Sequence, residues 1–152
     1  MSLKQISILC ARISLFVIYF WFGLLKVIGL SPASGMVQEL FGKTLTPMLH
    51  ALHISFLTPE IFVVAFGVVE MIIGILLLIP GKEKIALIIF FAHMITTSLP
   101  LFFLKDSVWT RAFVPTLEGQ YIVKNLALIA CAIAIWEIAP ARNKSSSAPP
   151  VV

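Results

Sequence analysis

Ionisable side chains occur inside long apolar segments of this chain, where they are costly unless they are paired, protonated or in contact with water. Glu70 is the one charged residue of the segment 61–80, IFVVAFGVVEMIIGILLLIP. Lys26 interrupts a second apolar segment and His93 interrupts a third. An imidazole exchanges protons near neutral pH, and a carboxylate beside it can hold or pass on a proton. These residue types predict proton exchange with a small molecule inside a membrane.

The candidate residues are predicted to lie at similar depths. Tyr19, Glu70 and His93 fall within about 3 Å of one another in depth when each segment is counted at about 1.5 Å per residue. Helical side chains lean toward the N-terminus of their helix, so Lys26 and Glu70, on segments of opposite direction, lean toward each other. We therefore expect an ion pair or a water-bridged pair in a polar pocket. The predicted lining of this pocket is Tyr19, Lys26, Glu70, His93, Thr97 and Lys124.

A quinone head group would suit such a pocket, because its carbonyl oxygens need donors such as Lys26, Tyr19 or His93. Three structural alternatives remain open. Lys26 and Glu70 could serve as a pair that holds two helices together. Thr96 and Thr97 could bond the carbonyl groups of their own helix that Pro100 leaves free. His93 could be a satisfied hydrogen-bond donor between helices rather than a reactive group.

The remaining reactive residue types predict no further chemistry. Cys10 and Cys131 form no C-x-x-C motif, and we expect two apolar fillers that form neither a disulfide nor a catalytic dithiol. His50 and His53 have an i,i+3 spacing, but no third ligand accompanies them, so we predict interfacial polar residues and no metal site.

The composition identifies an integral membrane protein. The 152 residues are 60% hydrophobic and 12% charged, and their mean hydropathy is +1.06. Soluble domains are about 25% charged, so the predicted environment is a lipid bilayer. The net charge is +4, and the basic residues are scattered between apolar segments, which predicts no nucleic-acid partner.

Four apolar segments are long enough to cross a bilayer as helices. These segments are residues 13–30, 61–80, 85–104 and 122–139. They predict an all-α fold, a transmembrane four-helix bundle over residues 1–139, followed by a disordered cytoplasmic tail at 140–152. Two stretches between the first and second segments, 33–42 and 44–54, have helical patterning and predict short interfacial helices.

Small residues on the predicted helices mark the expected packing faces, because they let helix backbones approach closely. On the first two helices these are Gly23, Gly67 and Gly74, and on the fourth they are Ala127, Ala130, Cys131 and Ala134.

Charge bias in the connections predicts the orientation. Six basic residues fall on the side of the two termini, namely Lys4, Arg12, Lys82, Lys84, Arg142 and Lys144, and three fall on the other, Lys43, Lys105 and Arg111. Because basic connections favour the cytoplasm, both termini are predicted to be cytoplasmic.

Three segments resemble the DoxX-like membrane proteins: WFGLLK at 21–26, VVEMIIGILLLIP at 68–80 and VPTLEGQYIVKNLALI at 114–129. They are most similar to the branch that includes the inner-membrane protein of the bacterial reactive-chlorine resistance system. The resemblance implies four transmembrane helices, a prokaryotic plasma membrane and a link to redox or oxidative-stress functions. The name-giving members are subunits of a thiosulfate:quinone oxidoreductase. Positions that match the family pattern are Arg12, Gly23, Lys26, Glu70, Gly74, Lys124 and Asn125.

The residues and the resemblance together predict a small redox-associated membrane subunit with a quinone-accessible pocket and a membrane or redox-enzyme partner. No catalytic residue and no flavin, haem or iron–sulfur ligand set is assigned. One alternative is a non-enzymatic scaffold or assembly partner. Another is a small-solute or proton-coupled carrier, for which a homo-oligomer would have to supply the pathway, because the chain shows no inverted repeat.

Overall fold

The computed structural model describes residues 2–53 and 56–145, with side chains described as far as Glu137. Four of its helices are long and apolar enough to cross a membrane. These are α1 (Leu3–Val27), α4 (Pro59–Leu78), α5 (Glu83–Ser98), which with α6 forms one apolar span to Phe103, and α8 (Leu117–Ser145). The predicted all-α membrane bundle is confirmed.

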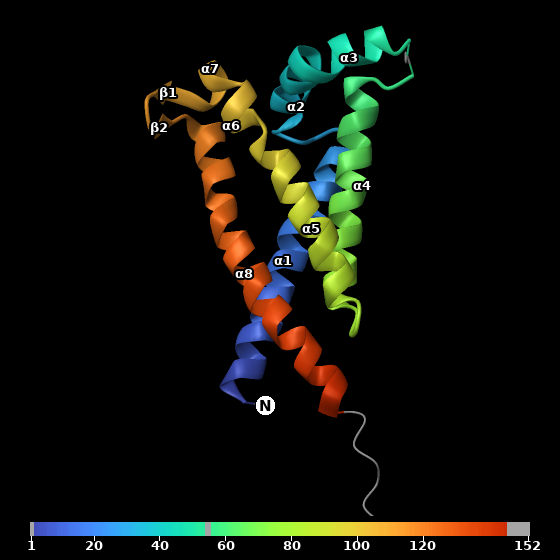
Figure 1. The fold of residues 1–152 in the computed structure, drawn as a ribbon, viewed down its shortest axis with the longest axis vertical. Helices are drawn as coiled ribbons and strands as arrows, with labels where there is room; N and C mark the ends of the chain where they lie inside the picture. Colours follow the sequence, from blue (N-terminus) through green and yellow to red (C-terminus); the bar gives the residue numbers. More distant parts are fainter. Residues whose placement is uncertain (1, 54–55, 146–152) are drawn as a thin grey trace, which may run out of the picture.

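The short elements gather at one end of the bundle, which we call the cap end (Figure 1). They are α2 (Ser34–Leu40), the π-helix η1 (Phe41–Leu45), α3 (Thr46–Ala51), α6 (Pro100–Phe103), α7 (Lys105–Val108), β1 (Trp109–Arg111) and β2 (Val114–Pro115). The N-terminus and the α4–α5 turn lie at the opposite end, which we call the turn end. Gly81 makes that turn with a φ of +82°, a conformation that glycine adopts without strain.

Capping residues explain where the long helices begin. α1 begins at Leu3 rather than at 13, because Ser2 and Gln5 form a capping box ahead of the apolar segment. Thr58 caps α4 by accepting a hydrogen bond from the Ile61 amide, and Pro59 follows as its first residue. α8 continues past 139 to Ser145, so it includes the first residues of the predicted tail, while 146–152 lie outside the described residues.

The α1–α4 contact is close because glycines face each other across it. A Cβ atom on Gly23 would lie 2.6 Å from the carbonyl oxygen of Gly67, and one on Gly67 would lie 2.6 Å from that of Gly23. Gly74 is less crowded, since its nearest neighbour would be the Phe20 amide nitrogen at 3.2 Å. All three glycines predicted to pack helices therefore lie where α1 crosses α4.

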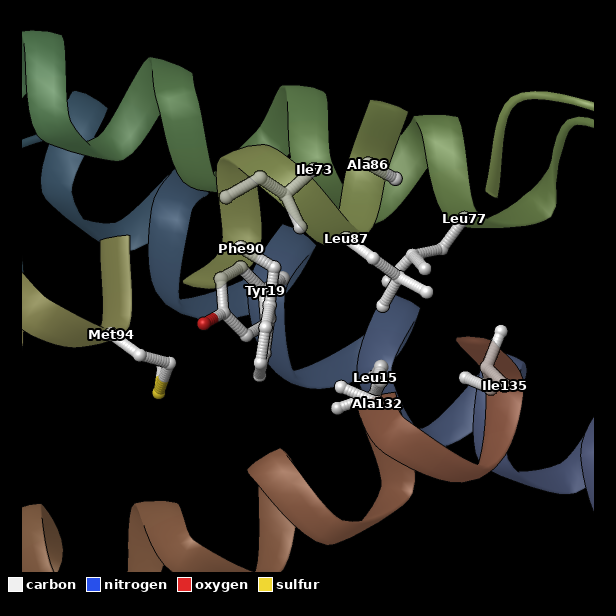
Figure 2. Close-up of a cluster of buried hydrophobic side chains, with 10 residues drawn as sticks. All are labelled: Leu15, Tyr19, Ile73, Leu77, Ala86, Leu87, Phe90, Met94, Ala132 and Ile135. Atoms are coloured by element: carbon white, nitrogen blue, oxygen red, sulfur yellow. The ribbon is translucent and has the colours of Figure 1, made fainter. Parts of the chain in front are cut away.

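A buried apolar cluster joins all four long helices (Figure 2). Its members are Leu15, Tyr19, Ile73, Leu77, Ala86, Leu87, Phe90, Met94, Ala132 and Ile135. A smaller cluster of Leu104, Val108 and Ile122 holds the cap end of α8.

The prediction of the packing face of α8 is wrong for contacts within this chain, because other residues of the helix are buried against its neighbours. Ala127, Ala130 and Ala134 are exposed and Cys131 is half-buried. α8 instead packs through Ile122, Ala132 and Ile135. Helix contacts within a membrane depend on van der Waals packing, and the observed face, which combines Ala132 with two isoleucines, supplies more of it than the predicted face of small residues.

The cap end contains one interruption that the sequence predicts and several short elements that it does not. The third span is interrupted at Leu99, as expected from Pro100, which has no amide hydrogen to continue the helix. α7 and an antiparallel β1–β2 pair follow in the region expected to be a loop. The indole nitrogen of Trp109 donates to the carbonyl of Leu101 at 3.2 Å, which ties the hairpin to α6.

A polar contact connects α2 to α7. The Glu39 carboxylate accepts hydrogen bonds from the Ser107 hydroxyl at 2.8 and 3.0 Å and from the Lys43 ammonium at 2.7 Å. The bond from Lys43, followed by that from Ser107, lowers the pKa of Glu39. The same contact with Glu39 raises the pKa of Lys43, so the pair stays charged at neutral pH.

Acidification is expected to loosen this contact. Because the pKa of Glu39 is lower in the folded state than in the unfolded state, its stabilising contribution is present above the unfolded value and is lost as the pH falls through the folded one. Hydrogen-exchange protection factors of the α7 amides should therefore decrease in the wild type as the pH is lowered. In Glu39→Gln the protection factors should be lower than those of the wild type at neutral pH, and they should change little as the pH is lowered. An equal acid response in both proteins would contradict the assignment.

Candidate functional site

Four buried side chains from α1, α4 and α5 meet in what we call the polar group: Tyr19, Lys26, Glu70 and His93. The Lys26 ammonium donates to Glu70 Oε2 at 2.6 Å. His93 Nε2 lies 3.2 Å from the other carboxylate oxygen, Oε1. The Tyr19 hydroxyl and His93 Nδ1 are 3.4 Å apart, a hydrogen bond whose direction depends on the imidazole tautomer. The residues are 3–7% exposed, so the group is withdrawn from the surface.

Helix geometry accounts for this meeting. Tyr19 and Lys26 are seven residues apart on α1, which places both on the face that packs against α4. A Cβ atom on Gly67 would lie 2.6 Å from the Cβ atom of Lys26, so the absence of a side chain there makes room for the lysine. The glycine crossing therefore positions Lys26 opposite Glu70, one turn further along α4.

Aromatic rings hold the imidazole of His93. The Phe66 ring stacks on it with centroids 4.3 Å apart and an interplanar angle of 26°. The Tyr19 ring meets it edge-on, with centroids 5.4 Å apart. The sequence does not single out Phe66 as a site residue, because phenylalanine is common in apolar helices. Its i−4 spacing from Glu70 nevertheless places it on the same face of the helix.

One atom of the polar group lacks a hydrogen bond. His93 Nε2 is buried and, although it lies near Glu70 Oε1, it has no hydrogen-bond partner among the residues that the structure describes. An unsatisfied buried nitrogen costs roughly 1–3 kcal/mol. This nitrogen therefore has hydrogen-bonding capacity that the described residues do not use.

The arrangement can move a proton along a short chain of groups. The chain runs from the Tyr19 hydroxyl through the two imidazole nitrogens to the Glu70 carboxylate, and Lys26 balances the charge of that carboxylate. Histidine suits the central place because its two nitrogens can release and accept protons in turn.

A family model described as the DoxX-like family matches residues 33–136, more than half of the chain. The chain belongs to the DoxX-like family. The matched range contains Glu70 and His93, whereas Tyr19 and Lys26 precede it. Neither a curated protein nor a solved structure gives a significant match.

Two residues of the predicted pocket are not brought into the polar group of this DoxX-like protein. Thr97 is half-buried, and its hydroxyl donates to the carbonyl of Met94 at 3.0 Å, a bond within its own helix but not to the Thr96 carbonyl that Pro100 leaves without its usual donor. Lys124 is exposed, and its ammonium lies 5.4 Å from the centre of the Tyr121 ring. Since Lys124 lies in the first turns of α8, its long side chain can reach past the apolar region.

A second buried ion pair lies at the turn end. Arg12 contacts the Glu83 carboxylate at 2.9 Å and donates from Nε to the carbonyl of Leu77 at 2.7 Å. It thus joins α1 to the end of α4 and the start of α5. The sequence does not predict this pair, because the third span expected from it begins at residue 85, whereas the helix begins at Glu83.

The other reactive residues of the DoxX-like protein lie apart from the polar group. Cys10 is exposed, Cys131 is half-buried and both are free thiols. His50 and His53 are exposed on or just after α3. No three potential metal ligands converge among the residues described.

Proposed function

We propose that this multi-pass DoxX-like protein is a redox-associated subunit of a prokaryotic plasma membrane, and that its polar group binds a quinone head group. The observation that carries the proposal is the buried, unsatisfied Nε2 of His93 beside a paired carboxylate. Positive-inside bias supports a cytoplasmic turn end and a cap end on the opposite side. The family resemblance supports a redox enzyme as the partner and a role in oxidative stress.

The polar group offers what a quinone needs. A quinone carbonyl accepts a hydrogen bond, and in one tautomer His93 Nε2 is an N–H donor that makes no hydrogen bond among the described residues, although Glu70 Oε1 lies 3.2 Å away. Reduction to the quinol adds one proton to each carbonyl oxygen and an equal number of electrons to the ring. In this proposal His93 and Glu70 pass the protons, and the partner redox enzyme supplies the electrons.

Bound small molecules test the proposal directly. The protein would be purified in mild detergent, and extracts of the wild type, Glu70→Gln and Lys124→Gln would be analysed by mass spectrometry. We expect stoichiometric quinone in the wild type and in Lys124→Gln, whose changed side chain lies outside the polar group. We expect its loss from Glu70→Gln.

Absence of quinone from every form, together with co-purification of an intact second subunit, would contradict the proposal and favour the scaffold alternative. In that case Glu70→Gln should leave partner association intact. Enlargement of Ala130, which is exposed on α8, should weaken it.

A further inference from the structure

We infer, on the basis of the proposed function, that ligand and protons reach the polar group only from the cap end, along a column of aromatic rings closed by Phe41. Two independent features carry the inference. An apolar layer closes the turn end, and a continuous series of aromatic contacts leads from the cap end to His93.

The apolar layer lies between the polar group and the Arg12–Glu83 pair. On α1, Leu15 lies between Arg12 and Tyr19, and on α4, Ile73 and Leu77 follow Glu70 toward the turn end. On α5, Leu87 and Phe90 lie between Glu83 and His93. These five side chains are at most 1% exposed and lie in one cluster (Figure 2). A proton cannot cross this layer without a polar side chain or water to carry it.

The aromatic column runs in the other direction. The ring of Phe66, which stacks on His93, also stacks on Phe62 with centroids 5.7 Å apart and an interplanar angle of 19°. Phe62 in turn contacts Phe41, again at 5.7 Å. Phe62, Phe66 and Glu70 have i, i+4, i+8 spacing, so the rings follow one face of α4 from its cap end down to the polar group.

Phe41 is placed to close this column. It is 3% exposed, whereas Phe62 and Phe66 are half-buried. It begins the π-helix η1, a rare geometry that is frequent at functional sites. The neighbouring Glu39 holds this segment to Ser107 of α7 by hydrogen bonds. The Phe41 ring meets that of Phe62 at an interplanar angle of 58°, so its displacement would uncover part of Phe62, against which the planar ring of a quinone could pack.

Thiol accessibility tests this route without using a quinone. Cys10 and Cys131 are replaced by serine, and Phe66→Cys or Phe62→Cys is introduced as a reporter in membrane vesicles of each orientation. A membrane-impermeant charged methanethiosulfonate is then added. Both reporters should react from the cap end only, Phe62→Cys faster than Phe66→Cys. Ile73→Cys, in the apolar layer, should react from neither side.

Adding Phe41→Ala should raise the labelling rate of Phe66→Cys roughly tenfold, which corresponds to loss of one aromatic contact of about 1.4 kcal/mol. Labelling from the turn end, absence of labelling at both reporters, or no effect of Phe41→Ala would overturn the inference. Labelling from the cap end without any quinone in the extracts would keep this access route and reject the proposed ligand.

Discussion

Lys26→Met is expected to lower the free energy of unfolding by about 3–5 kcal/mol, because it leaves the Glu70 carboxylate buried without its ammonium partner. Methionine keeps most of the length and apolar character of the lysine side chain, so the lost charge dominates the effect. Glu70 is 6% exposed and Lys26 is 7% exposed, so water replaces neither partner readily. Equilibrium unfolding in mixed detergent micelles measures the change.

The double variant Lys26→Met, Glu70→Gln is the matched control. It removes both charges, and it should recover most of the stability lost in the single variant. Quinone occupancy should nevertheless remain low in the double variant. A cost below about 1 kcal/mol for Lys26→Met would instead be typical of a solvated pair and would contradict the buried arrangement.

Measuring stability and quinone occupancy separately shows whether the Lys26–Glu70 pair only holds two helices together or also serves ligand binding. Replacing a buried ion pair by neutral side chains is often neutral or stabilising, so stability alone does not account for charges at this depth. If the pair only holds α1 against α4, the double variant should differ from the wild type in stability alone, and the folded protein should still retain ligand. If it serves the polar group, the double variant should fold but fail to retain ligand.

Gly67→Ala is expected to lower the free energy of unfolding by about 3 kcal/mol, at the upper end of the usual overpacking cost. The added methyl group would lie 2.6 Å from the Gly23 carbonyl oxygen and 2.6 Å from the Lys26 Cβ atom. The nearest atoms belong to backbone or to the first carbon of a side chain, so α1 and α4 must move apart. That movement separates Lys26 from Glu70, and quinone occupancy should fall together with stability.

Alanine substitutions at two other glycines provide a comparison for the stability cost of Gly67→Ala. Gly74→Ala should cost less, because its new Cβ atom would come no closer than 3.2 Å to a neighbour. Gly35→Ala, at an exposed position of α2, meets nothing within 4 Å and should leave stability unchanged or slightly raised. The same unfolding assay compares all three, and equal costs for Gly67→Ala and Gly35→Ala would show that α1 and α4 do not cross closely.

Hydropathy and helix geometry explain much of what the sequence predicts correctly. The spans follow from apolar length, and the meeting of Tyr19, Lys26, Glu70 and His93 follows from their depths and from the direction in which each side chain leans. These rules work because the glycine contacts bring α1 and α4 so close that the shared face of each helix is unambiguous.

Other features depend on tertiary contacts that periodicity does not reveal. The middle of α8 is apolar on every side, so its helical period selects no packing face, and the alanine stripe was misleading. The π-helix at Phe41 and the strands Trp109–Arg111 and Val114–Pro115 are too short to leave a periodic pattern. The Arg12–Glu83 pair depends on helix ends, which pattern reasoning places least accurately.

The most direct test of the account is the infrared spectrum of a quinone with isotopically labelled carbonyl carbons, added to the purified protein. A hydrogen bond from His93 Nε2 weakens the carbonyl bond, so one labelled band should lie at lower frequency than in an empty detergent micelle. His93→Leu should return that band to the micelle frequency, whereas Lys124→Gln should leave it at the wild-type position. A wild-type band at the micelle frequency, or one that His93→Leu does not move, would contradict the assignment of the polar group as the binding site.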